Sequence, residues 1–71
     1  MSGELKQARL RLGLTQSQMA TLMGMHQSHY SDIERGTNGR KPTRGHWACV
    51  RLIEHCHQAG MIDQVLALYN T

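Results

Sequence analysis

The stretch of sequence that decides the fold runs from Thr15 to Gly36 and reads TQSQMATLMGMHQSHYSDIERG. Thr15 occupies the position of a helix N-cap, and Gln18, three residues later, can complete a capping box. The apolar residues that follow share one helical face and stop at Gly24. This pattern predicts a helix over 16–23.

A second helix is predicted after a turn of three residues, 24–26. Tyr30 and Ile33 stand at i and i+3 and the pattern stops at Gly36, so this helix is expected over 27–35. Two short helices joined by a tight turn that begins with glycine have the geometry that places the second helix in the major groove of DNA. Helix pairs of this length occur in many proteins, so the spacing alone does not identify the function.

Three more helices are predicted outside this pair. Apolar residues at helical spacing indicate a helix over 3–12, before Gly13. Beyond a loop at 37–42, Thr43 can cap a long helix that runs to about Gln58. An amphipathic fifth helix is predicted within 61–71, and its apolar stripe consists of Ile62, Val65, Leu66 and Tyr69.

The composition favours one small helical domain. A chain of 71 residues has room for a single core, and that core must be aliphatic because the only aromatic residues are Tyr30, Trp47 and Tyr69. No apolar stretch approaches the roughly 20 residues that span a bilayer, and no signal-type apolar segment follows Met1, so a cytoplasmic protein is expected. The expected fold class is all-α, a compact five-helix domain over residues 1–71.

The charge of the chain points to a polyanionic partner. The formal net charge is +3 at pH 7. A basic balance alone is shared by many proteins, so the distribution of charge is more informative. Between residues 35 and 44 the sequence has four basic residues and no acidic one, in a segment with the composition of a loop: Arg35, Arg40, Lys41 and Arg44.

The segment 15–36 resembles the Cro/CI-type (XRE-type) family of repressors. In that family the first helix of the pair opens with a cap and a glutamine, continues with a large apolar residue and alanine, and ends at a glycine-apolar turn. The resemblance extends over about residues 5–36 and implies a lambda-repressor-like helix-turn-helix fold that binds double-stranded DNA in a sequence-specific way. The matching residues are Thr15-Gln16, Met19-Ala20, Gly24-Met25 and Ile33-Glu34-Arg35-Gly36.

Two residues depart from the family pattern, and beyond Gly36 the resemblance is general. His26 stands at the cap of the recognition helix, and Tyr30 replaces the usual aliphatic residue, so its ring is expected in the core with its hydroxyl reaching the edge of the domain or a phosphate. The loop and long helix after Gly36 are similar to small phage-type repressors, including anti-CRISPR-associated (Aca-type) autoregulators.

The resemblance also implies roles for individual residues. Arg9 and Glu34 are expected to form a largely buried ion pair that ties the first helix to the end of the recognition helix. Asp32 is interpreted as a reader of cytosine, a negative filter, or a residue that points to the flank. The residues expected to face base edges are Gln27, Ser28, His29, Ser31 and Asp32. The residues expected to contact phosphates are Gln16, Arg35, Asn38, Arg40, Lys41 and Arg44.

The remaining reactive residues do not form a recognisable chemical site. Cys49 and Cys56 lie seven apart in one predicted helix, roughly 10 Å between Cα atoms, which is too far for a disulfide between them. His46 shares their face, but the compact spacing of a structural zinc site is missing. Ser28, His29 and Asp32 lie on one short helix without an oriented partner or pocket, so no enzyme, metal, cofactor or small-molecule ligand is expected.

The sequence therefore favours a transcriptional repressor that occludes a promoter, with its own promoter as one candidate. The last helix, through Ile62, Val65, Leu66 and Tyr69, is expected to form a homodimer that binds an inverted repeat. The alternative is an antitoxin-like or other protein-interaction module that uses the same fold and the same last helix for a partner.

Overall fold

The structure, a computed structural model, describes residues 3–69 except for the side chain of Asn38. Within these residues the five predicted helices are present, and the all-α fold is confirmed. A short 3₁₀ helix, η1, occupies part of the segment that was predicted to be loop. The elements are α1 (Glu4–Arg11), α2 (Gln16–Leu22), α3 (Gln27–Arg35), η1 (Thr37–Gly39), α4 (Arg44–Gln58) and α5 (Ile62–Leu68).

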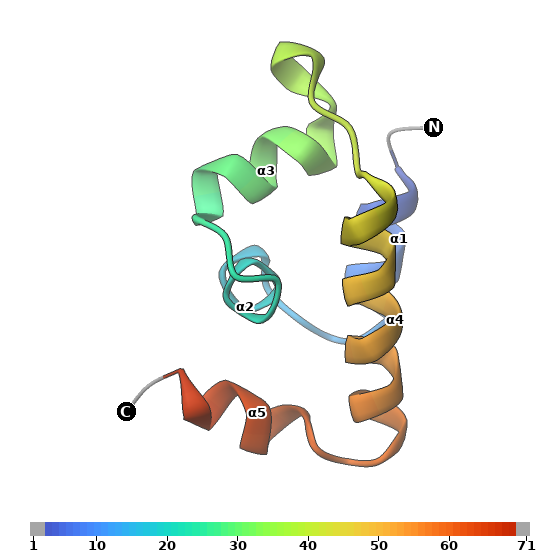
Figure 1. Ribbon diagram of the computed structural model, residues 1–71, viewed down its shortest axis with the longest axis vertical. Helices are drawn as coiled ribbons and strands as arrows, with labels where there is room; N and C mark the ends of the chain where they lie inside the picture. Colours follow the sequence, from blue (N-terminus) through green and yellow to red (C-terminus); the bar gives the residue numbers. More distant parts are fainter. Residues whose placement is uncertain (1–2, 70–71) are drawn as a thin grey trace.

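The helices surround α2, which is seen end-on in Figure 1. α3 packs on one side of α2, and α5 packs on α2 and on the end of α4. α1 contacts α3, and α4 lies beside α1. This arrangement leaves α3 supported from below by α1 and α2, with its opposite face open to solvent.

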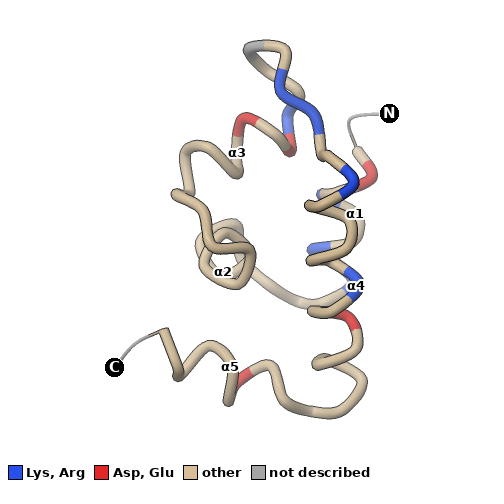
Figure 2. The backbone as a smooth tube through the Cα atoms, in the orientation of Figure 1, with Lys and Arg blue, Asp and Glu red and all other residues tan. Residues whose placement is uncertain are grey.

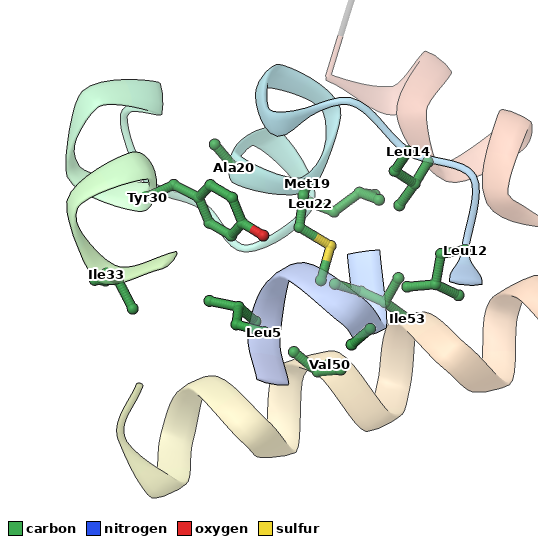
Figure 3. Close-up of a cluster of buried hydrophobic side chains, with 11 residues drawn as sticks. Leu5, Leu12, Leu14, Met19, Ala20, Leu22, Tyr30, Ile33, Val50 and Ile53 are labelled. Atoms are coloured by element: carbon green, nitrogen blue, oxygen red, sulfur yellow. The ribbon is translucent and has the colours of Figure 1, made fainter. Parts of the chain in front are cut away.

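Apart from Tyr30, the core is aliphatic, as predicted, and each of the first four helices contributes to it. Figure 3 shows Leu5 of α1, Val50 of α4 and Met19 of α2 gathered in the space between these helices. Leu52 of α4 is 67% exposed, because the buried stripe of that helix is centred on Val50 and Ile53. The buried apolar residues are Leu5, Ala8, Leu12, Leu14, Met19, Ala20, Leu22, Tyr30, Ile33, Val50 and Ile53.

Capping boxes fix where two of the helices begin. The Thr15 hydroxyl accepts a hydrogen bond from the Gln18 N–H at 3.1 Å, and the Gln18 side chain accepts one from the Thr15 N–H at 3.0 Å. Thr43 forms the same reciprocal pair with His46 at the start of α4. Because these bonds satisfy N–H groups that would otherwise lack partners, both helix starts are determined locally.

Arg9 and Glu34 form the expected ion pair between α1 and α3. The Arg9 Nε donates to Glu34 Oε2 at 2.9 Å, and Nη2 donates to Oε1 at 3.2 Å. The third nitrogen, Nη1, donates to the carbonyl oxygen of Leu14 at 2.9 Å. Gln16 adds a hydrogen bond from Nε2 to Glu34 Oε1 at 3.1 Å. One carboxylate therefore joins α1, the start of α2 and the end of α3.

Glu34 is ionised in this setting although its side chain is only 4% exposed. Burial by itself raises the pKa of the carboxyl, but hydrogen bonds, led by those from Arg9, outweigh burial and bring the pKa below its usual value. The same contact raises the pKa of Arg9. A buried pair of this kind is costly to break from one side, because the remaining charge has no partner.

Tyr30 differs from the prediction in one respect. Its ring is in the core, as expected, but the hydroxyl is buried with it, since the residue is 0% exposed. The prediction that the hydroxyl reaches the domain edge or a phosphate is therefore wrong. Burial raises the pKa of Tyr30, and the nearby Glu34 carboxylate raises it further, yet no hydrogen bond of regular geometry reaches the hydroxyl oxygen.

Replacing Glu34 by Gln should reduce the free energy of unfolding by about 3 to 5 kcal/mol, because Arg9 then keeps a buried charge without a partner. In the wild type, the lowered pKa of Glu34 stabilises the fold above the pKa of an unfolded Glu, about 4.3, and this stabilisation is lost as the pH falls through the lower, folded pKa. Urea denaturation between pH 3 and 7 measures both effects.

The Glu34→Gln variant should lack this acid-dependent loss. Glu4→Gln, at an exposed position in the first turn of α1, is the matched control and should change the free energy by less than about 1 kcal/mol. Equal acid sensitivity in the wild type and Glu34→Gln would contradict the assignment.

Replacing Tyr30 by Phe removes a buried hydroxyl that has no regular hydrogen bond. The free energy of unfolding should stay the same or rise by up to about 1 kcal/mol, because a buried polar group without a partner is destabilising. Tyr69→Phe, at a residue that is 55% exposed, is the control and should have no effect. A clear loss of stability in Tyr30→Phe alone would show that the hydroxyl bonds to Glu34 in solution.

Candidate nucleic-acid interface

The turn between α2 and α3 sets the direction of the recognition helix. Gly24 has φ +71°, a left-handed conformation that favours glycine, and the chain reverses there. The N–H of Met25 then donates to the carbonyl oxygen of Ala20 at 3.0 Å, which fastens the turn to α2. The glycine-started turn predicted at 24–26 is thus present with its backbone bonds satisfied.

His26 caps α3 with its imidazole ring. Its Nδ1 accepts a hydrogen bond from the backbone N–H of Ser28 at 3.3 Å and lies 2.9 Å from the Ser28 hydroxyl. The sequence placed His26 at the cap but did not indicate which atom of the imidazole would accept the backbone hydrogen bond. The ring substitutes for the short oxygen side chain usual at this position.

The first turns of α3 present polar side chains on the open face of the domain. Gln27 and Ser28 are exposed, and His29, Ser31 and Asp32 are half-buried. Several of these residues line a shallow hollow of about 370 Å³ between the starts of α2 and α3. All five predicted base-contacting residues are therefore accessible on one short helix, which is the arrangement that a major-groove helix requires.

Gln16 has two possible roles, and the structure shows one of them. Its side-chain nitrogen donates to Glu34, so the residue supports the ion pair described above. The amide has a second N–H, and the residue lines the hollow at the start of α3. A phosphate contact from this second N–H stays a prediction.

The basic residues after α3 form a cationic strip, defined here as Arg35, Arg40, Lys41 and Arg44. All four are exposed. Figure 2 shows the blue segments near the end of α3, along the loop and at the start of α4, whereas α5 has none. Positive charge is thus concentrated at one end of the recognition helix. The side chain of Asn38, also predicted to contact phosphate, lies outside the described part of the structure.

Asp32 of α3 is contacted by residues of the same helix and of the segment that follows it. Its Oδ1 accepts a hydrogen bond from the Thr37 hydroxyl at 3.0 Å and lies 3.5 Å from Arg35 Nη2. Its Oδ2 lies 3.7 Å from Arg40 Nε. The pair with Arg35 follows from i, i+3 spacing on α3. The pair with Arg40 was not anticipated from the sequence, because Arg40 is brought close only by the η1 turn.

The four predicted dimer residues do not share one environment. Ile62, Val65 and Leu66 are partly buried against the core, whereas Tyr69 is 55% exposed. Beside α5, an apolar groove is lined by residues of α2, α4 and α5, among them the half-buried free cysteines Cys49 and Cys56. The exposed apolar surface in this region therefore belongs to α4 as much as to α5.

Other kinds of site are not apparent in residues 3–69. This part of the chain holds no group of three or more His, Cys, Asp and Glu side chains placed to bind a metal ion. None of its helices is both long enough and apolar enough to cross a membrane.

Comparison with known proteins identifies the family. Residues 5–46 match the family model described as Helix-turn-helix, and this match covers more than half of the chain. Neither the curated proteins nor the solved structures gave a match. The match, the all-α lambda-repressor-like arrangement and the exposed polar face of α3 agree with one another. The chain belongs to the XRE-type helix-turn-helix family of DNA-binding transcription regulators.

Proposed function

We propose that this protein is a transcriptional repressor that binds an inverted repeat as a homodimer and prevents transcription by covering a promoter. The observation that supports it best is the separation of two kinds of residue along α3. Polar side chains of modest size lie at its start, and the cationic strip lies at its end. In this proposal the start of α3 contacts bases, and the strip contacts phosphates on the flank.

The base contacts are assigned to Gln27, Ser28, His29 and Ser31. A Gln side chain can bond the N6 and N7 atoms of adenine, and Ser can serve several bases. The strip and the second N–H of Gln16 contribute affinity that depends on salt but does not depend on sequence. The general likeness to small phage-type autoregulators makes the promoter of its own gene the first DNA to test.

The dimensions of the domain suit a dimer on one face of DNA. Its principal extents are 33 × 23 × 19 Å. Two copies side by side can therefore place their recognition helices about 34 Å apart, one turn of the double helix. Of the four predicted dimer residues, Tyr69 beyond α5 has the most exposed side chain, at 55%, and it is assigned to the surface that makes the contact. The second candidate function, an antitoxin-like module, would use the same surface for a different protein.

Selection of bound sites from random duplex DNA at two salt concentrations tests the proposed function. An inverted repeat should be enriched at both. Gln27→Ala should relax the preference at one or two base pairs, because it removes a base contact. Lys41→Ala should weaken binding to every sequence and reduce the salt slope by about one unit, because it removes a phosphate contact.

Lys6→Ala, on the exposed face of α1, is the control for loss of a positive charge elsewhere. Binding without enrichment of any sequence would contradict the proposal that the protein is a sequence-specific repressor. If Gln27→Ala and Lys41→Ala behaved alike, the separation of roles along α3 would be wrong.

Sedimentation tests the homodimer. The chain has a mass of 8.0 kDa, and the wild type should sediment as a particle of twice that mass at micromolar concentration. Tyr69→Asp should shift it toward the monomer, because a charge cannot be buried there without a partner. Gln58→Asp, at an exposed position at the end of α4, serves as the control. A wild-type monomer that nevertheless binds a protein partner through this surface would favour the antitoxin-like alternative.

A further inference from the structure

Asp32 forms ion pairs with the cationic strip, since its carboxylate lies within 4 Å of two of the four arginine and lysine side chains there. Arg35 lies one helical turn after it, at 3.5 Å, and Arg40 returns to it from beyond η1, at 3.7 Å. The side chain of Asp32 is 25% exposed, while those of Arg35 and Arg40 are 64% and 45% exposed. The carboxylate is therefore at the surface, where DNA would come close to it.

The position of Asp32 is held independently of the arginines. The Thr37 hydroxyl donates to Oδ1 at 3.0 Å, and Thr37 is the first residue of η1. This hydrogen bond fastens the end of α3 to the turn that brings Arg40 back. The contact between Asp32 and Arg40 thus follows from the local fold.

A carboxylate and a phosphate compete for the same guanidinium groups. Both are anionic oxygen acceptors, and Arg binds either with its N–H donors. A phosphate bound by Arg35 or Arg40 competes with Asp32 for the guanidinium charge, and the carboxylate keeps its own charge close to the negative DNA backbone. Each phosphate contact made by these two arginines is therefore partly offset by the loss of a contact within the chain.

We propose that Asp32 limits the affinity of the domain for DNA of any sequence by holding Arg35 and Arg40, so that tight binding depends on the base contacts at the start of α3. This proposal rests on the proposed function, since it assigns Arg35 and Arg40 to phosphates. Asp32 is then a specificity-determining residue that acts through two neighbours.

The contacts of Asp32 favour this role over direct reading of cytosine. Reading would require a carboxylate oxygen aimed at the base edge and available to accept from cytosine N4. Oδ1 already accepts from Thr37 and faces Arg35, and Oδ2 faces Arg40. Both oxygens are directed toward the loop that follows α3.

The test is Asp32→Asn, measured with a 20-base-pair duplex of random sequence over a range of salt concentrations. Asn keeps an oxygen that can accept from Thr37 but has no charge. The variant should bind this duplex about 3- to 10-fold more tightly at 0.1 M salt, since two surface ion pairs no longer compete. The salt slope should steepen by about one unit, because no freed carboxylate takes up a cation on binding.

Two controls separate this mechanism from a simple change of net charge. Asp63→Asn makes the same chemical change at an exposed position of α5, away from the cationic strip, and should alter binding by less than 2-fold. In a variant that carries both Arg35→Ala and Arg40→Ala, adding Asp32→Asn should give little or no gain. Circular dichroism and thermal melting confirm that each variant is folded.

Three results would overturn the proposal. Asp32→Asn could bind random duplex no more tightly than the wild type. The gain could persist in the absence of both arginines, which would show that Asp32 acts by repulsion alone. The variant could instead lose preference for cytosine at one selected position, which would make Asp32 a reader. None of these results would contradict the proposed repressor function, because that function is tested separately, by whether the wild type selects an inverted repeat.

Discussion

The buried pair between Arg9 and Glu34 is the interaction on which the rest of the structure depends. It joins the first helix to the end of the recognition helix, and Gln16 and the carbonyl of Leu14 extend it to the start of α2. The apolar contacts among these helices tolerate small rotations of one helix against another, because aliphatic side chains can repack. The bidentate pair of guanidinium and carboxylate does not tolerate such rotations, because its two parallel hydrogen bonds fix the relative orientation of the two groups. The orientation of α3 relative to α1 is therefore set by a polar contact among apolar side chains.

With α3 fixed at its end, the two halves of its open surface can serve different purposes. The start of the helix has short polar side chains, and the end adjoins the cationic strip. Asp32 lies between them and faces the strip. The same helix thus brings together groups that distinguish sequences, groups that attract any polyanion, and one carboxylate that opposes the attraction. All three kinds of group lie within α3 and the segment that follows it.

Much of this architecture could be predicted from the sequence, because the determining signals are local. Thr15 with Gln18, Gly24 and the Ile33-Glu34-Arg35-Gly36 end of α3 each act within one or two turns of helix, and the helix bounds follow from them. The Arg9–Glu34 pair was predictable only through family resemblance, since 25 residues separate its members. The contact of Asp32 with Arg40 and the exposure of Leu52 could not be predicted. Both depend on how η1 and α4 are rotated, which side-chain spacing does not determine.

The histidine caps have a consequence of another kind. At His26 and His46 the acceptor for a backbone N–H is the ring atom Nδ1, whereas Ser, Thr, Asp and Asn caps use oxygen. An imidazole can accept through a ring nitrogen only while that nitrogen has no proton, and an imidazolium ring has no acceptor at all. The caps at the starts of α3 and α4 therefore hold both rings in the tautomer whose proton is on Nε2, so that His26 presents an N–H donor at the base-contacting end of the recognition helix, which an oxygen cap would not.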